Sequence, residues 1–178
     1  MKNKIGMSAK NIALIGAMTA AIEVGKIELM AIPNVEVVSL LISVFGYVFG
    51  FSALLSTCLF VVIETLLWGF GSWVIAYSIH WNILCFLFCV LGMKRIENKV
   101  LLTTVALVMT TLFGVLTSLI EIGLFSGTFS DFGYRFAIYY SRGASFYITQ
   151  IVCNAILFPL AFMPIKRVLI KAKNKYEL

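Results

Sequence analysis

The sequence predicts an all-α, polytopic membrane protein with six transmembrane helices and both termini in the cytoplasm. Of its 178 residues 61% are hydrophobic and only 12% are charged, whereas a soluble domain is nearer half apolar and a quarter charged. Its apolar residues form several runs of about 20 residues, the length that crosses a bilayer as a helix. Its basic residues fall in a few short segments between those runs. At this length we expect one six-helix domain, residues 1–178.

Glycines, prolines and charged residues divide the chain into six apolar runs. Pro33 ends the first, because proline cannot donate to a continuing helix. The glycine-rich segment 69–72 is a turn, and the polar, aromatic loop 125–141 is long enough to fold over a site. Pro159 and Pro164 predict kinks in the last helix. The expected helices cover residues 11–32, 35–49, 52–68, 73–92, 100–123 and 143–169.

Charge predicts the orientation. Eleven of the fourteen basic residues lie at one side of the expected helices, and basic segments remain in the cytoplasm. The termini and the loop 93–99 are therefore expected inside. A cleavable signal peptide is not expected, because the first run carries Glu23 and Lys26. The eleven residues are Lys2, Lys4, Lys10, Lys94, Arg95, Lys99, Lys166, Arg167, Lys171, Lys173 and Lys175.

Acidic residues are expected together at the outer side. A charge at the centre of a bilayer helix costs about 2.5–3.5 kcal/mol, so several carboxylates at one level predict a shared polar site. The alternative, pairing at the headgroup level with Lys26 or Arg142, stays open for Glu36 and Glu121. Because acids outnumber bases there, the solute is expected to carry hydrogen-bond donors or positive charge. These acids are Glu23, Glu28, Glu36, Glu64, Glu121 and Asp131.

Aromatic and polar side chains predict the walls of this site. Trp68 and Trp73 suit an interfacial belt, whereas Tyr77 and Trp81 continue inward and suit a pocket for a ring-bearing solute. Ordinary helix packing is the alternative for this wall, and interhelical hydrogen bonding is the alternative for the polar residues of the last helix. The predicted solute-binding residues are Glu28, Asn34, Glu64, Trp68, Trp73, Tyr77, His80, Trp81, Glu121, Arg142, Tyr147, Gln150 and Asn154.

No motif predicts catalysis, a metal, a cofactor or nucleic-acid binding. The four cysteines are expected as buried apolar residues, and one histidine supplies too few ligands for a metal site. No nucleophile–base pattern or phosphate loop is present. Two alternatives to a protein that only binds a solute remain. One is a stand-alone ion-coupled carrier that titrates Glu64 or Glu121, and the other is a small membrane enzyme using these acids and His80.

A ladder of small residues follows one face of the first helix. Ala9, Ala13, Ala17, Ala21 and Gly25 recur at four-residue spacing, which makes that face flat enough for close helix packing. The ladder is longer than one internal contact needs, so we expect it to dock another protein. Close packing inside the chain is the alternative.

Three stretches of the sequence carry a family resemblance. They are the ladder core Ala13-Leu-Ile-Gly-Ala17 and the turns at 32–36 and 69–73. Over nearly its whole length the chain resembles the substrate-binding S components of energy-coupling factor (ECF) vitamin transporters. These are six-helix membrane proteins with cytoplasmic termini that bind a vitamin or metal ion from outside. They work with a transmembrane coupling protein and two ATPase subunits.

The resemblance implies roles for two regions. The face formed by Ala9, Ala13, Ala17 and Ala21 is expected to contact the coupling protein, and the solute is expected near the outer surface under the first, third and fifth loops. The first loop is shorter here than in many members, which assigns a lid role to 125–141. The expected protein is a non-catalytic, multi-pass subunit of an importer in a bacterial plasma membrane. It carries no ATPase motif, so its energy must come from the partners.

Overall fold

The computed structural model describes residues 7–32, 35–125 and 130–177, apart from the side chain of Phe125. These residues form six α-helices joined by short connecting segments. A single π-helical turn, η1 (Glu121–Phe125), extends the fifth helix. The helices are α1 (Ala9–Leu29), α2 (Val38–Phe49), α3 (Phe51–Trp68), α4 (Ser72–Met93), α5 (Lys99–Ile120) and α6 (Phe132–Tyr176).

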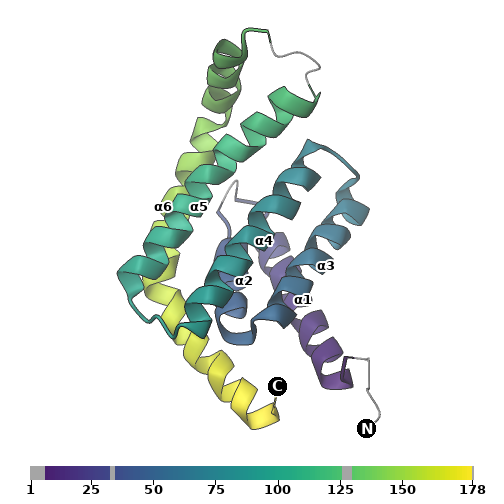
Figure 1. Ribbon diagram of the computed structural model, residues 1–178, viewed down its shortest axis with the longest axis vertical. Coiled ribbons are helices and arrows are strands. Elements are labelled where there is room, and N and C mark those ends of the chain that lie inside the picture. Colours follow the sequence, from purple (N-terminus) through teal and green to yellow (C-terminus); the bar gives the residue numbers. More distant parts are fainter. Residues whose placement is uncertain (1–6, 33–34, 126–129, 178) are drawn as a thin grey trace.

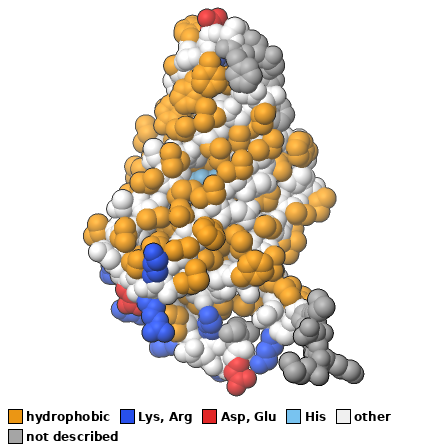
Figure 2. Space-filling view, in the orientation of Figure 1, with side chains coloured by type: hydrophobic (Ala, Val, Ile, Leu, Met, Phe, Trp, Pro, Cys, Tyr) orange, Lys and Arg blue, Asp and Glu red, His pale blue; other side chains and the backbone are white. Residues whose placement is uncertain are grey.

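The helices run alternately up and down, so the start of α1 and the end of α6 lie at the same end of the molecule (Figure 1). Lys10 Nζ donates to the carbonyl oxygen of Tyr176 at 3.1 Å, which ties these two ends together. Lysines and arginines gather at this end on the face shown in Figure 2. We call it the basic end. The end of α1 and the α3–α4 turn lie away from this end, and the start of α6 lies farthest from it (Figure 1).

Four helices are long and apolar enough to cross a membrane: α3, α4, α5 with its π-helical extension, and α6. This confirms the all-helical, membrane-protein class that the composition predicts. The apolar α2 is only 12 residues long, so it crosses the membrane only where the bilayer is thinned around it. Helix α1, with 21 residues, is long enough to cross a bilayer. It is not among these four helices, and it carries four charged residues, Lys10, Glu23, Lys26 and Glu28.

Helix α2 is the centre of the packing. Ile42 and Val44 are completely buried, and α2 packs closely on α4. A Cβ atom added to Gly92 of α4 would collide with the backbone of Tyr47. The α2–α3 turn is a single residue, Gly50, at φ +60°, a conformation that glycine adopts without strain. Gly92 thus lets α4 approach α2 closely, and Gly50 makes the tight turn between α2 and α3.

The last helix is much longer than the sequence predicts. Residues 132–141, expected as part of a covering loop, are the first turns of α6, so the predicted lid is wrong for this part. Residues 126–129 of that loop lie outside the described residues. The physical reason is the spacing of Phe132, Phe136 and Tyr140, whose rings stack at 6.3 and 5.8 Å on one helix face. Helix α6 also continues through both of its prolines.

Candidate functional site

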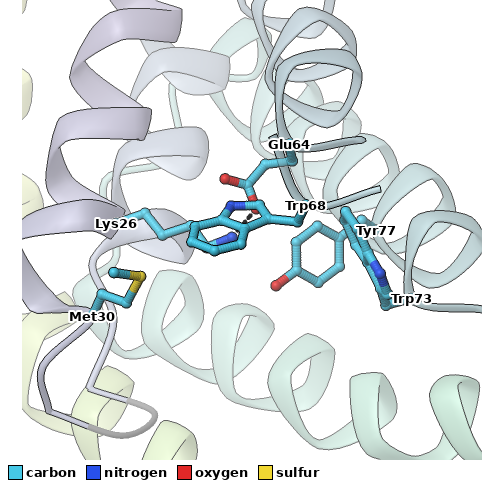
Figure 3. Close-up of a pocket in the computed structure, with 6 residues that line it drawn as sticks. All are labelled: Lys26, Met30, Glu64, Trp68, Trp73 and Tyr77. Carbon is cyan, nitrogen blue, oxygen red and sulfur yellow. Dashed lines mark hydrogen bonds and ion pairs between the residues drawn. The ribbon is translucent and has the colours of Figure 1, made fainter. Parts of the chain in front are cut away.

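A cavity of about 220 Å³ lies between the ends of α1, α3 and α4, opposite the basic end. Figure 3 shows Lys26 of α1 reaching toward Glu64 of α3, with a group of aromatic rings beside them. Helices α1 and α3 end here and α4 begins here, so three separate segments each supply side chains. The lining residues are Lys26, Met30, Glu64, Trp68, Trp73 and Tyr77.

The ion pair between Lys26 and Glu64 is the main polar feature of the cavity. The Glu64 side chain is 2% exposed, while that of Lys26 is 26% exposed, so the acid is buried and the base reaches the cavity. Two turns back on the same face of α1, the hydroxyls of Thr19 and Ser56 lie 3.0 Å apart and fix α1 against α3. A carboxylate this deeply buried needs a partner, because its desolvation is not otherwise compensated.

A second cavity of about 200 Å³ adjoins the first. The two cavities share Lys26, Met30 and Tyr77 in their linings. We therefore treat them as two parts of one site, which we call the hollow. The second part extends to the start of α2 and to α6. Its remaining lining residues are Leu29, Ile32, Val35, Glu36 and Gln150.

Glu36 is held firmly by neighbouring donors. Its carboxylate accepts from the backbone N–H of Ser39 at 2.8 Å and from the Ser39 hydroxyl at 2.6 Å, which caps α2. The amide Nδ2 of Asn154, on α6, donates to the same carboxylate at 2.9 Å and to the Thr110 hydroxyl at 3.0 Å. Glu36 therefore joins α2 and α6, and through Asn154 also α5.

Aromatic rings surround the Lys26 ammonium. Its Nζ atom lies 5.4 Å from the centre of the Tyr77 ring and 6.0 Å from that of Phe60. These distances allow a cation–π attraction. Tyr77 also meets Trp73 edge-on at 5.2 Å. A positive charge at this point is thus stabilised by one carboxylate and by two aromatic faces.

His80 and Trp81 lie behind this wall rather than on it. Both are buried, and both pack on Phe113 of α5, with ring centres 4.8 and 6.0 Å apart. Trp81 meets Tyr77 edge-on at 5.8 Å. Tyr77 therefore lines the cavity together with Trp68 and Trp73. His80 and Trp81, one helical turn further along α4, pack behind Tyr77 and line neither of the cavities described here.

Several predicted site residues lie away from this hollow. Glu28 and Arg142 are exposed, and Glu121 belongs to the π-helical turn at the end of α5. Tyr147 packs at the α5–α6 contact, where its hydroxyl lies 3.2 Å from that of Thr117. Asn34 lies outside the described residues. Among the polar residues predicted on α6, Gln150 lines the hollow and Asn154 reaches it through Glu36.

Sequence reasoning left Lys26, Met30 and Glu36 out of the predicted binding set. A signal for Lys26 was present, since Glu23 and Lys26 are three residues apart in an apolar helix and so share one face. Glu23 adds a feature that the sequence does not reveal. It is only 8% exposed, and neither carboxylate oxygen has a hydrogen-bond partner among the described residues.

The arrangement suits binding of a small solute. It is a partly open hollow with aromatic walls and one ion pair, with Glu36 in its lining and Glu23 three residues before Lys26 on α1. Within the described residues, no three or more His, Cys, Asp and Glu side chains are grouped to hold a metal ion. No protein-family model, curated protein or solved structure matches the chain.

Proposed function

We propose that the chain is a non-catalytic, solute-binding subunit of an ECF-type, ATP-driven importer in a bacterial plasma membrane. In this role it spans the membrane six times with cytoplasmic termini and takes up a small vitamin-like solute from outside. It docks through α1 to a transmembrane coupling protein that works with two ATPase subunits. The hollow around Lys26 is its solute site, and the protein needs no cofactor of its own.

The observation that carries this proposal is the position of the hollow. It is lined by the end of α1 and the residues on either side of the α3–α4 turn, away from the basic end that Figure 2 shows, and by the positive-inside rule the basic end faces the cytoplasm. A solute site at the outer surface is what an uptake protein requires. A buried carboxylate and an aromatic wall give the site polar and stacking contacts for one small molecule.

The alanine face of α1 supports the docking role. Ala9, Ala13, Ala17 and Ala21 are all exposed, whereas the opposite face of α1 packs on the core through residues such as Met18 and Ile22. Ala13 and Ala17 line a cavity of about 540 Å³ beside the end of α6, so the face is left open rather than filled by the core of this chain. An exposed flat face can accept a partner helix at close range.

Two measurements test the proposal. Mass spectrometry of the purified protein should identify a bound small molecule, and uptake of that molecule should require co-expressed coupling and ATPase subunits.

Replacing Ala13 and Ala17 together by Trp should abolish uptake and co-purification of the coupling protein but preserve solute binding in detergent. The matched control is Ala155→Trp, at an exposed alanine of α6. Intact uptake in the double variant would contradict docking through α1.

Orientation is tested separately by labelling single cysteines from outside the cell. A cysteine at Ser130, beside the start of α6, should react, whereas cysteines at Asn98 and Asn174 should not. The reverse pattern would place the hollow on the cytoplasmic side and remove the case for uptake.

A second candidate is a stand-alone carrier driven by protons or sodium. The burial of Glu23 and Glu64 favours it, because buried carboxylates are typical of proton and ion pathways in membranes. Uptake by the chain alone, abolished by a proton-gradient uncoupler at constant ATP, would support this carrier. Uptake that needs the ATPases and resists the uncoupler would support the importer.

A further inference from the structure

We infer that the hollow binds a ring-bearing organic cation, which displaces the Lys26 ammonium from Glu64, and that Glu23 accepts the displaced ammonium. This inference deepens the proposed function and rests on it only in taking the hollow as the solute site. Before the solute binds, the Lys26 ammonium therefore occupies the point at which the solute's positive charge will bind.

The surroundings of Lys26 are those of a cation-binding site. Its ammonium contacts the buried carboxylate of Glu64 and lies over the rings of Tyr77 and Phe60. A carboxylate with aromatic faces is a common way for proteins to recognise organic cations. A protonated amine or amidine on a solute would find the same carboxylate and rings at this point.

The balance of charge around the hollow favours a cation over an anion. Glu36 and Glu64 line it, and Glu23 lies three residues before Lys26 on α1, whereas Lys26 is the one base among the described lining residues. Arg142, one of the predicted solute-binding residues, is exposed and lines neither part. An anionic solute would therefore meet an excess of negative charge, with its one counter-ion already engaged.

Glu23 gives the displaced ammonium a place to go. It lies three residues before Lys26, so the two side chains are neighbours on one face of α1. Glu23 is buried without a hydrogen-bond partner in this structure, and an unpaired buried charge is costly. Lys26 has a flexible four-carbon stem and is a quarter exposed, so it can turn from one acid to the other.

The exchange improves the pairing of buried charges. In this structure Lys26 pairs with Glu64, and Glu23 has no hydrogen-bond partner among the described residues. In the loaded site the solute pairs with Glu64, and Lys26 pairs with Glu23. Binding of a cation thus leaves no carboxylate of this pair without a partner, whereas a neutral solute leaves the arrangement as it is.

The size of the hollow limits the solute. The part between Lys26 and the two tryptophans measures about 220 Å³. An apolar cavity of roughly 150 Å³ holds a benzene molecule. We therefore expect one aromatic ring, or a small fused pair, with a short basic side chain, and the ring lies against Trp68, Trp73 or Tyr77.

The test uses purified full-length protein and a matched series of three probes. Benzylammonium, benzyl alcohol and benzoate share one ring and differ in charge. Binding is followed by the fluorescence of Trp68 and Trp73, which line the site. We expect benzylammonium to bind at least tenfold more tightly than benzyl alcohol, with benzoate weakest. Equal affinities, or tighter binding of benzoate, would overturn the inference.

Glu23→Gln tests the exchange itself. It removes the acceptor but retains Glu64 and the rings, so benzylammonium should bind about tenfold more weakly while benzyl alcohol is unaffected. Glu28→Gln is the matched control, because Glu28 lies on the same helix but is exposed and lines neither part. No change in Glu23→Gln, or an equal loss for both probes, would contradict the exchange.

A second variant covers the case in which Glu23→Gln does not fold. Glu64→Gln should abolish the preference for benzylammonium over benzyl alcohol, and persistence of that preference would overturn the inference. Failure here is separable from failure of the proposed function. The titrations need no coupling partner, so they stand whether or not ATP-driven uptake is found. ATP-driven uptake of a neutral or anionic solute would refute the inference alone.

Discussion

Two lysine–glutamate pairs occupy opposite ends of this molecule, and they are built in opposite ways. In the hollow, the acid is buried and the base is accessible: Glu64 is 2% and Lys26 26% exposed. At the basic end, the base is buried and the acid is accessible: Lys166 is 6% and Glu97 68% exposed. The same two residue types therefore face contrasting surroundings.

The pair at the basic end is an anchor. The Lys166 ammonium lies 5.0 Å from the centre of the Tyr47 ring, and the Tyr47 hydroxyl donates to the carbonyl of Ile96 at 3.0 Å. Lys173, further along α6, donates to the carbonyl of Val48 at 2.7 Å. These contacts tie α6 to α2 and to the α4–α5 loop at several points.

The difference indicates in which pair the lysine can be replaced by another cation. A buried acid must always be neutralised, but its partner can be replaced if that partner is accessible and a cavity is present. A buried lysine that packs on a ring cannot leave without losing that packing. We therefore expect changes at the hollow to alter binding as well as stability, and changes at the basic end to alter stability alone.

The largest effect is expected for Lys26→Met. It leaves Glu64 and Glu23 buried without a cation, so the free energy of unfolding should fall by about 3–5 kcal/mol. Unfolding by sodium dodecyl sulfate in mixed micelles measures this. Glu64→Gln on the same background should restore part of the loss, because one uncompensated charge is then removed. Unchanged stability in Lys26→Met would show that the acids are solvated.

Glu64→Gln alone is expected to separate binding from stability. It should weaken binding of the co-purified small molecule by about 1.5–3 kcal/mol, the scale of a hydrogen bond to a charged group. Stability should change little, because Lys26 can then pair with Glu23. Titration of the purified variant gives the affinity. Unchanged affinity here, and also in Trp81→Ala and Gln150→Ala, would mean that the solute binds elsewhere.

A smaller effect is expected for Lys166→Met at the basic end. Methionine keeps most of the apolar stem, so the main loss is the attraction between the ammonium and the Tyr47 ring. That loss should lower the free energy of unfolding by about 1 kcal/mol. Solute affinity should be the same as in the unchanged protein. A loss as large as that of Lys26→Met would remove the distinction between the two pairs.

The smallest effect concerns the pH dependence of the basic end. A hydrogen bond from the Lys166 ammonium, together with its charge, holds the pKa of Glu97 below its usual value. The pair therefore contributes stability above the unfolded-state pKa of about 4.3, and this is lost as pH falls through the lower folded-state pKa.

Glu97→Gln removes this titration. The stability difference between the unchanged protein and the variant should be constant from neutral pH to about pH 5 and should shrink below about pH 4. Acid titrations of both proteins in detergent measure it. A difference that grows on acidification would have the wrong sign for a lowered pKa.

Local features of the sequence were enough to predict most helices. The expected run 73–92 became α4 (Ser72–Met93), and 52–68 became α3 (Phe51–Trp68), because glycine turns bound α3 at both ends and precede α4. The segregation of basic residues to one end was also predictable, since helices that alternate in direction bring every second loop to the same end. The exception, α6, begins eleven residues early because ring stacking along one face outweighed the polar composition.

The sequence by itself determined that this is a helical membrane protein with one basic end and with acids and aromatic residues toward the other. Hydropathy, helix breakers and charge fix these properties locally. Only the tertiary structure decided which acids converge. Glu64 meets Lys26 across 38 residues of sequence, and Glu36 meets Asn154 across 118. Glu28, at the end of the same helix as Lys26, remains exposed. Which side of a helix meets its neighbour depends on how whole helices pack, and no local pattern contains that information.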